Sequence, residues 1–237
     1  MIVETPSARH NPAAMRQRTV ERMRRTPIDW RSAFHRNALQ RSHQARAFTL
    51  IELLVVIAII AILIGLLFPA FRAVQNQAKQ TQAKNDLTQI VNAVNAYYTD
   101  YGKYPLVTAD TIYGPAGTPN NLLFNELRAT ATATQNPRQI VFINPPYVKT
   151  PANPRSGIAT QATTINGISV AINDYVDPWG TPYNVAIDGG YDNQLTNPYT
   201  ANAGPSPLAI GVIAWSRGRD QGQGTDFSAS DDVISWQ

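Results

Sequence analysis

Two groups of carboxylates lie where their surroundings suggest a chemical role. Glu52 is the single charged residue in the apolar run 48–68. A charge among apolar groups costs free energy unless an opposite charge lies beside it, so Glu52 needs a specific reason to be there. The second group places four carboxylates within 13 residues near the C-terminus: Asp220, Asp226, Asp231 and Asp232.

Four acidic residues in a Gly- and Ser-rich segment can supply ligands for a hard cation. Ca²⁺ takes roughly six to eight oxygen ligands, so backbone carbonyls would have to complete the shell around these carboxylates. The spacing is not that of an EF-hand. Aspartates in Gly-rich loops also occur in solvated turns, and composition alone leaves both interpretations open.

The remaining residue types exclude most enzyme classes. The chain has no Cys, and its three histidines, His10, His35 and His43, all precede residue 48. The part from residue 48 onward therefore has no thiol nucleophile, no Ser-His triad and none of the histidines that commonly bind zinc. Its acidic residues form no evident acid/base pair. We predict that the protein is not an enzyme.

The apolar run around Glu52 is predicted to cross a membrane. Its 21 residues would span about 32 Å as a helix, against a hydrocarbon layer of about 30 Å. Sixteen of them are Leu, Ile, Val or Phe, which together outweigh the cost of about 3 kcal/mol for one charge. A buried core helix is the alternative, but a soluble domain rarely surrounds so long a helix with apolar groups. A cleaved secretory signal would have an apolar run of only about 7 to 15 residues.

Charge is distributed unevenly on the two sides of this run. Residues 1–47 contain ten Arg and three acidic residues, a net charge of +7, whereas residues 48–237 contain ten basic and 13 acidic residues, a net charge of −3. By the positive-inside rule, the basic segment stays in the cytoplasm and the chain after residue 68 lies outside. No aromatic platform or recognised domain accompanies the arginines, so we expect no nucleic-acid partner.

After the run, the chain is predicted to continue as an amphipathic helix. Pro69 should kink this helix, and the Gly and Pro of the stretch 100–105 should end it. The apolar stripe follows spacings of three and four residues: Leu87, Ile90, Val91, Val94, Tyr97, Tyr98 and Tyr101. In the rest of the chain we expect a short helix at 122–128 and strands at 168–172, 183–187 and 208–215, forming a small antiparallel sheet on the long helix.

The stretch RAFTLIELLVVIAIIAIL, residues 46–63, closely resembles the class III signal of type IV pilins and type II secretion pseudopilins. The resemblance implies that a prepilin peptidase cuts between Ala47 and Phe48 and that the new amino group of Phe48 is methylated. It also implies that this amine pairs with Glu52 of a neighbouring copy during assembly. A pair within one chain is the alternative, because the two groups are one helical turn apart. The family usually has Gly where this chain has Ala47.

Three further segments resemble the major pseudopilin of type II secretion. They are AYYTDYGKYP at residues 96–105, DPWGTPY at 177–183 and the C-terminal stretch 215–236. The DPWG segment is expected to be a structural corner. In that family the C-terminal loop binds calcium, and Asp220 and Asp226 are the better matches to its ligand positions.

These features predict an α+β, pilin-like protein in four parts. They are a cytoplasmic basic leader that is removed (1–47), a transmembrane half-helix (48–68), an amphipathic half-helix (69–101) and a periplasmic head (102–237). The resemblance implies a structural subunit of a pseudopilus for type II secretion, held in the bacterial inner membrane by a single span. Its implied partners are further copies, minor pseudopilins, prepilin peptidase, an inner-membrane assembly platform and membrane lipid. A type IV pilin, a competence pseudopilin, or a single-span anchored binding protein or enzyme are the alternatives.

Overall fold

The computed structural model describes residues 48–115 and 117–237. Residues 53–237 form one compact unit, and of the unit before it only residues 48–52 are described. The predicted leader, and Ala47 with it, lies outside the described residues.

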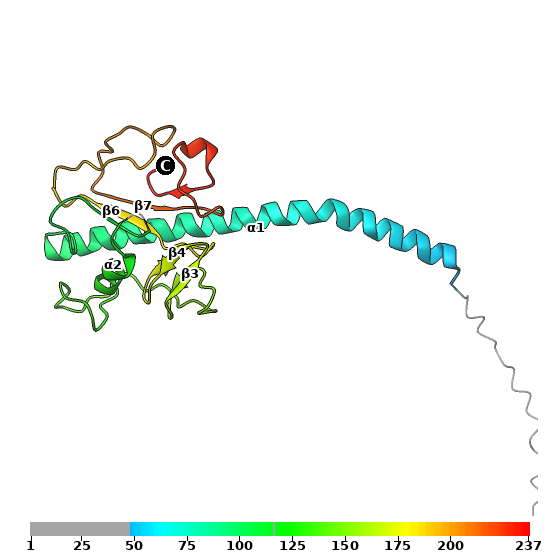
Figure 1. Ribbon diagram of the computed structural model, residues 1–237, viewed down its shortest axis with the longest axis horizontal. Helices are drawn as coiled ribbons and strands as arrows, with labels where there is room; N and C mark the ends of the chain where they lie inside the picture. Colours follow the sequence, from blue (N-terminus) through cyan, green and yellow to red (C-terminus); the bar gives the residue numbers. More distant parts are fainter. Residues whose placement is uncertain (1–47, 116) are drawn as a thin grey trace, which may run out of the picture. The chain divides into compact units, whose positions relative to one another are not determined.

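The long helix α1 runs over Leu50–Tyr101, 52 residues in all (Figure 1). It continues through Pro69, whose ring removes one backbone donor from the helix. Gly102 ends it, as predicted: this residue adopts the left-handed conformation, with φ of 67°, and its N–H donates to the Tyr98 carbonyl at 2.8 Å. A glycine in this conformation is the usual way to close the last helical turn.

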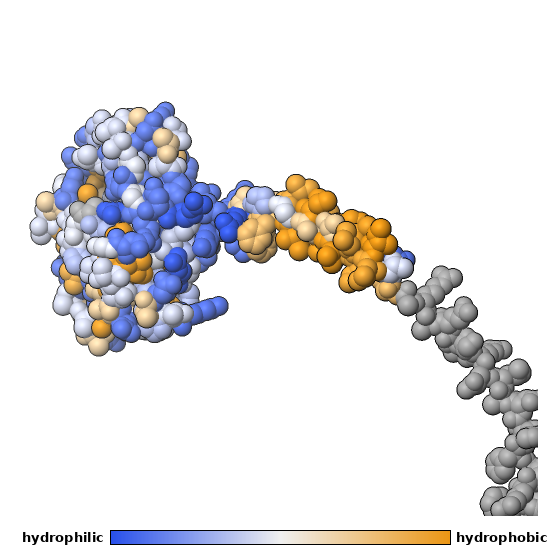
Figure 2. Space-filling model, turned by 45° about the vertical axis from the view of Figure 1, so that its right-hand side comes forward, coloured by the Kyte–Doolittle hydropathy of each residue, from blue (hydrophilic) through white to orange (hydrophobic). Residues whose placement is uncertain are grey.

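The two halves of α1 have different surroundings. Every residue from 48 to 75 is exposed, and the sixteen large apolar side chains of residues 48–68 range in exposure from 45% at Val56 to 88% at Leu50. On the face seen in Figure 2, this part of α1 is a mostly orange, apolar surface. The second half of α1 is buried on one face, by a stripe that begins at Ala83 and ends at Tyr97. Within the described residues, α1 is the one helix long and apolar enough to cross a membrane.

The main sheet packs against this buried stripe (Figure 1). It has the order β1-β6-β7-β8, and each neighbouring pair is antiparallel. The register places Ile187 opposite Val212 and Val185 opposite Ala214. The strands are β1, Thr111–Tyr113; β6, Asn184–Ile187; β7, Val212–Ser216; and β8, Val233–Ile234.

Both faces of the central strands are covered. Val185 and Ala214 pack with the α1 stripe, whereas Ala186, Ile213 and Trp215 face a second apolar cluster. This second cluster is built from the long connection between β6 and β7 and from the C-terminal segment: Leu195, Tyr199, Ala203, Leu208 and Ile234. Because alternate side chains of a strand point to opposite faces, a strand covered on both sides is apolar throughout.

The remaining elements are short. They are α2, Asn120–Leu127; the pair β2, Gly157–Ile158, and β5, Tyr175–Val176; the pair β3, Thr163–Ile165, and β4, Ile168–Val170; and the 3₁₀ turn η2, Phe227–Ala229. The predicted helix 122–128 and the three predicted strands are present with shifted ends as α2, β4, β6 and β7. Strands β6 and β7 pair in one antiparallel sheet as predicted, but β4 pairs with β3 in a separate two-stranded sheet. The architecture is the predicted one, an α+β, pilin-like arrangement of a long apolar helix with small antiparallel sheets.

Candidate functional site

Glu52 lies in the first turn of α1 and is held there by Thr49. Its carboxylate accepts from the Thr49 N–H at 2.9 Å and from the Thr49 hydroxyl at 2.8 Å. In return, the Glu52 N–H donates to the Thr49 hydroxyl at 3.2 Å. This reciprocal pattern is a capping box: the side chain of each of the two residues accepts a hydrogen bond from the backbone N–H of the other. The Glu52 side chain therefore has a structural role, separate from the recognition role predicted for its charge.

The residues around Glu52 present an apolar surface with few polar interruptions. Phe48 is 76% exposed and Leu50 is 88% exposed. A contiguous apolar surface that includes sixteen exposed large side chains indicates contact with another protein or with lipid.

Residues 42–68 match the family model of the prokaryotic N-terminal methylation motif. This motif is a class III, prepilin-like signal, and it covers the predicted cleavage site and the whole predicted membrane span. Comparison with curated proteins and with solved structures gave no match. The prepilin-like signal and the exposed apolar helix are consistent with anchoring by a single membrane span.

The DPWG corner lies between β5 and β6 and is closed by Asp177. One oxygen of this fully buried carboxylate accepts from the backbone N–H groups of Trp179, Gly180 and Thr181, at 2.9, 2.7 and 2.9 Å. The other accepts from the Ser216 hydroxyl at 2.5 Å. Burial raises the pKa of Asp177 to about 6, although these four hydrogen bonds favour its charged form.

This corner positions the start of the C-terminal acidic loop. Ser216 is the last residue of β7, and the side-chain amide of Gln221 donates to the Trp179 carbonyl at 2.9 Å. Asp220 is thereby held between two contacts with the corner. Trp179 itself is only 3% exposed, so its ring fills the core and offers no stacking surface.

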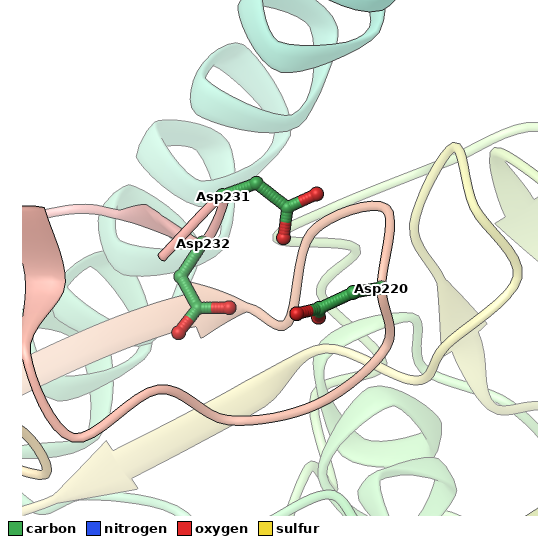
Figure 3. A group of neighbouring side chains, drawn as sticks. All are labelled: Asp220, Asp231 and Asp232. Atoms are coloured by element: carbon green, nitrogen blue, oxygen red, sulfur yellow. The ribbon is translucent and has the colours of Figure 1, made fainter. Parts of the chain in front are cut away.

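Three of the four predicted cation ligands come together in this loop. Oxygens of Asp220, Asp231 and Asp232 lie within 4.8 Å of one another, and Figure 3 shows the three side chains pointing into a shared space. Gly218 makes the arrangement possible, because a Cβ at this position would lie 2.3 Å from the Asp231 carbonyl oxygen. The close approach of the two backbone segments requires a residue without a side chain.

Each of the three carboxylates has one oxygen held by backbone donors. Asp220 accepts from the Gly222 N–H at 2.8 Å, Asp231 from the Arg219 N–H at 2.9 Å and Asp232 from the Gly224 N–H at 3.0 Å. The other oxygens of Asp231 and Asp232 are buried and have no hydrogen-bond partner. Unpaired buried acceptors in an oxygen-rich loop fit a hard cation.

Electrostatics also favour a cation at this cluster. Burial raises the pKa of Asp232, and the nearby charges of Asp220 and Asp231 raise it further, while hydrogen bonds from the Gly224 N–H and the Tyr199 hydroxyl oppose the increase. The one ion pair found among the described residues, Arg138 with Asp100, lies outside the cluster. Three neighbouring carboxylates without a paired side-chain cation repel one another, and a divalent ion would remove that repulsion.

Asp226, the fourth predicted ligand, is placed differently. It is the N-cap of η2, and one of its oxygens accepts from the Ser228 N–H at 3.0 Å and from the Asn202 side chain at 2.8 Å. Hydrogen bonds from the Asn202 and Ser228 side chains lower the pKa of Asp226. These hydrogen bonds go to one of its two oxygens, and the Asp226 carboxylate does not belong to the group formed by the other three.

Sequence reasoning missed one partner that was visible in the sequence. Thr49 and Glu52 have the spacing of a capping box directly before an apolar run, which is a known signature of a helix start. By contrast, the contacts of Asp177 with Ser216 and of Gln221 with Trp179 join residues far apart in the chain. No local pattern predicts such pairs.

Proposed function

We propose that this protein is a structural subunit of a filament, made as a precursor, anchored in a membrane by residues 48–68 and processed by a prepilin peptidase. The observation that carries the proposal is the methylation motif over residues 42–68, which coincides with a helix whose large apolar side chains are all exposed. A helix that binds only lipid needs no such signal. A helix that leaves lipid to pack with other copies in a filament needs the cut that this signal directs.

The size of the exposed apolar surface supports assembly through α1. Burying a large apolar side chain gains about 1.5–3 kcal/mol, and sixteen of them lie exposed along residues 48–68. Lipid can cover them in the membrane. In a filament outside the membrane, neighbouring copies of the same helix would have to do so.

Glu52 is the proposed assembly residue. Cutting between Ala47 and Phe48 would place an ammonium group on Phe48, directly before Thr49 of the capping box and four residues before Glu52. A carboxylate in the apolar interior of a filament is stable only beside an opposite charge, and the amine of a neighbouring copy supplies one. The pair would fix the axial position of each new subunit.

We further propose that the filament is a periplasmic pseudopilus of the type II secretion class, with minor pseudopilins and an inner-membrane platform as partners. The DPWG corner and the acidic C-terminal loop support this assignment over a generic pilin, because both segments resemble those of the major pseudopilin of type II secretion. In this chain, hydrogen bonds of Ser216 and Gln221 join the two segments. A type IV pilin and a competence pseudopilin are the competing assignments. Both would place the filament on the cell surface.

Calcium is the proposed ion of the C-terminal loop. Asp220, Asp231 and Asp232 would hold it, whereas Asp226 lies outside their group. The ion would supply positive charge and tie together the two ends of the connection between β7 and β8. Like a disulfide, such a link would stabilise the folded loop relative to the unfolded chain. The protein has no Cys and so cannot form a disulfide.

Two substitutions separate the assembly role of Glu52 from its capping role. Glu52→Gln keeps the capping box, since Gln can replace Glu there, but removes the charge. Thr49→Ala removes the capping box and keeps the charge. In cells that contain the assembly machinery, we expect Glu52→Gln to lower the cross-linked or sedimentable filament fraction at least tenfold, and Thr49→Ala to leave it within about twofold.

Intact mass of the membrane-extracted protein serves as the control for both variants. Each should yield a chain that begins at methylated Phe48, so that any loss of filament arises after processing. An equal loss of filament in the two variants would show that Glu52 matters for assembly because it caps the helix and not because of its charge. A mature mass that retains residues 1–47 would overturn the filament proposal altogether.

A further inference from the structure

A pair of aspartates, separate from the C-terminal acidic loop, lies at the opposite end of β6 from the DPWG corner. Asp188 directly follows β6 and Asp110 directly precedes β1. The antiparallel register pairs Thr111 with Ile187, so the next residue on each strand lies at the same end of the sheet. The fold therefore brings together two carboxylates that are distant in the sequence.

The hydrogen bonds of this pair leave one buried oxygen free. Asp188 is only 2% exposed. Its Oδ2 accepts from the Asn193 N–H at 2.7 Å, while its Oδ1 is buried and has no hydrogen-bond partner. Asp110 Oδ1 accepts a single long bond, 3.3 Å, from the Gly190 N–H. Both carboxylates thus keep acceptor capacity that no protein donor uses.

One oxygen of each carboxylate lies on the same side of Gly190. A Cβ at this glycine would lie 3.6 Å from Asp110 Oδ1 and 3.6 Å from Asp188 Oδ1, and no other residue beyond its chain neighbours would come within 4 Å. Gly190 itself is exposed, whereas Asp188 Oδ1 is shielded from solvent. An ion bound between the two carboxylates would therefore lie just beneath the exposed turn at Gly190.

No side-chain cation pairs with these carboxylates in the described part of the chain, where the one ion pair joins Arg138 to Asp100. A buried carboxylate without a counter-charge is strongly disfavoured. We propose that Asp110 and Asp188 bind a calcium ion beside Gly190. Ca²⁺ fits better than Mg²⁺ because it accepts irregular oxygen shells completed by carbonyls and water, whereas Mg²⁺ requires near-octahedral geometry.

The ion would fasten the connection between β6 and β7 to the segment before β1. That connection carries Leu195, Tyr199 and Leu208, which cover the outer face of the sheet. The site shares no residue with the C-terminal cluster and does not depend on whether the protein forms filaments. Its failure is therefore distinguishable from failure of the proposed function.

Calcium titration of the full-length protein in detergent tests the site. By isothermal calorimetry, we expect Asp188→Asn to bind one Ca²⁺ equivalent fewer than the unchanged protein. Asp110→Asn should lower the calcium affinity of that same site at least tenfold. Gly190→Ala should do the same while keeping its circular dichroism spectrum, because a methyl group would fill the ion's space without meeting any atom closer than 3.6 Å.

Asp192→Asn is the matched control. It removes one negative charge from the same loop, but the Asp192 carboxylate accepts from the Gln194 N–H and lies outside the space beside Gly190. It should leave the number of bound ions unchanged. The proposal is overturned if Asp188→Asn binds as many ions as the unchanged protein, or if Gly190→Ala binds with full affinity. Loss of the equivalent in Asp192→Asn alone would also overturn it.

Discussion

Asp177 illustrates how one buried carboxylate can make the stability of the protein depend on pH. Burial raises its folded-state pKa from 3.8 to about 6. Because the folded form holds the proton more tightly than the unfolded form, the associated stability is complete below about pH 4 and is lost as pH rises through about 6. At about 1.4 kcal/mol per pKa unit, the loss is on the order of 3 kcal/mol.

Asp177→Asn should flatten this pH profile, since the amide keeps an acceptor oxygen for the three backbone donors but does not ionise. Thermal unfolding by circular dichroism between pH 4 and 7, with a chelator present, measures the difference. Some slope should remain, because burial also raises the pKa values of Asp86, Asp174 and Asp232. Parallel profiles for the variant and the unchanged protein would contradict the prediction.

Individual residues differ in how far the sequence reveals their roles. Glu52 stands out because of its apolar neighbours, and Gly180 was expected in a turn and has φ of 100°. Asp226 was ranked above Asp231 as a cation ligand, yet it caps η2. Which acidic residues share a site depends on the path of the loop, which is set by backbone contacts such as that of Gly218 with Asp231.

The second half of α1 is the element on which the sheet depends. Leu87 is fully buried and lies in the same cluster as Val185 and Val212. Leu87→Ala should lower the free energy of unfolding by about 2–5 kcal/mol, through lost burial and the cavity left behind. Chemical denaturation of the detergent-solubilised protein measures this.

Leu122→Ala is the control for that substitution. Leu122 lies on α2 and is 47% exposed, so the same change should cost less than about 1 kcal/mol. Equal effects of the two substitutions would show that the α1 stripe does not hold the sheet.

Elements with a long repeating pattern were predictable, and very short ones were not. Helix α1 has an apolar stretch and then a regular stripe, and both its course and its end at Tyr101 were expected. Strands β1, β2, β5 and β8 have only two or three residues. A pattern of alternation needs about four residues to be recognised. These strands exist because distant partners pair with them.

At the scale of the whole molecule, the exposed half of α1 should be dispensable for folding of the head. The first buried residue of α1 is Ala83, and every described residue up to 75 is exposed. A chain that begins at residue 75 should therefore be monomeric without detergent. Its melting temperature should stay within a few degrees of that of the full-length protein, as measured by size exclusion and circular dichroism.

A second truncation provides the comparison. A chain that begins at residue 89 lacks Ala83, Asp86 and Leu87, and with Asp86 it loses the hydrogen bond from the Tyr183 hydroxyl. It should unfold at a clearly lower temperature or fail to fold. Aggregation of the longer chain, or equal stability of the two, would contradict the assignment of the boundary.

The positions of the tryptophans give this molecule a built-in optical reporter. Trp179 is almost completely buried in the cluster that includes the α1 stripe, and Trp215 is almost completely buried in the second apolar cluster, where the Trp236 ring packs edge-on against it. The apolar half of α1 contains no Trp, and Trp30 belongs to the segment that processing would remove. The intrinsic fluorescence of the mature chain would then come from the head alone. Opening of the head could be followed by emission in an intact bilayer, with no label and no signal from the membrane helix.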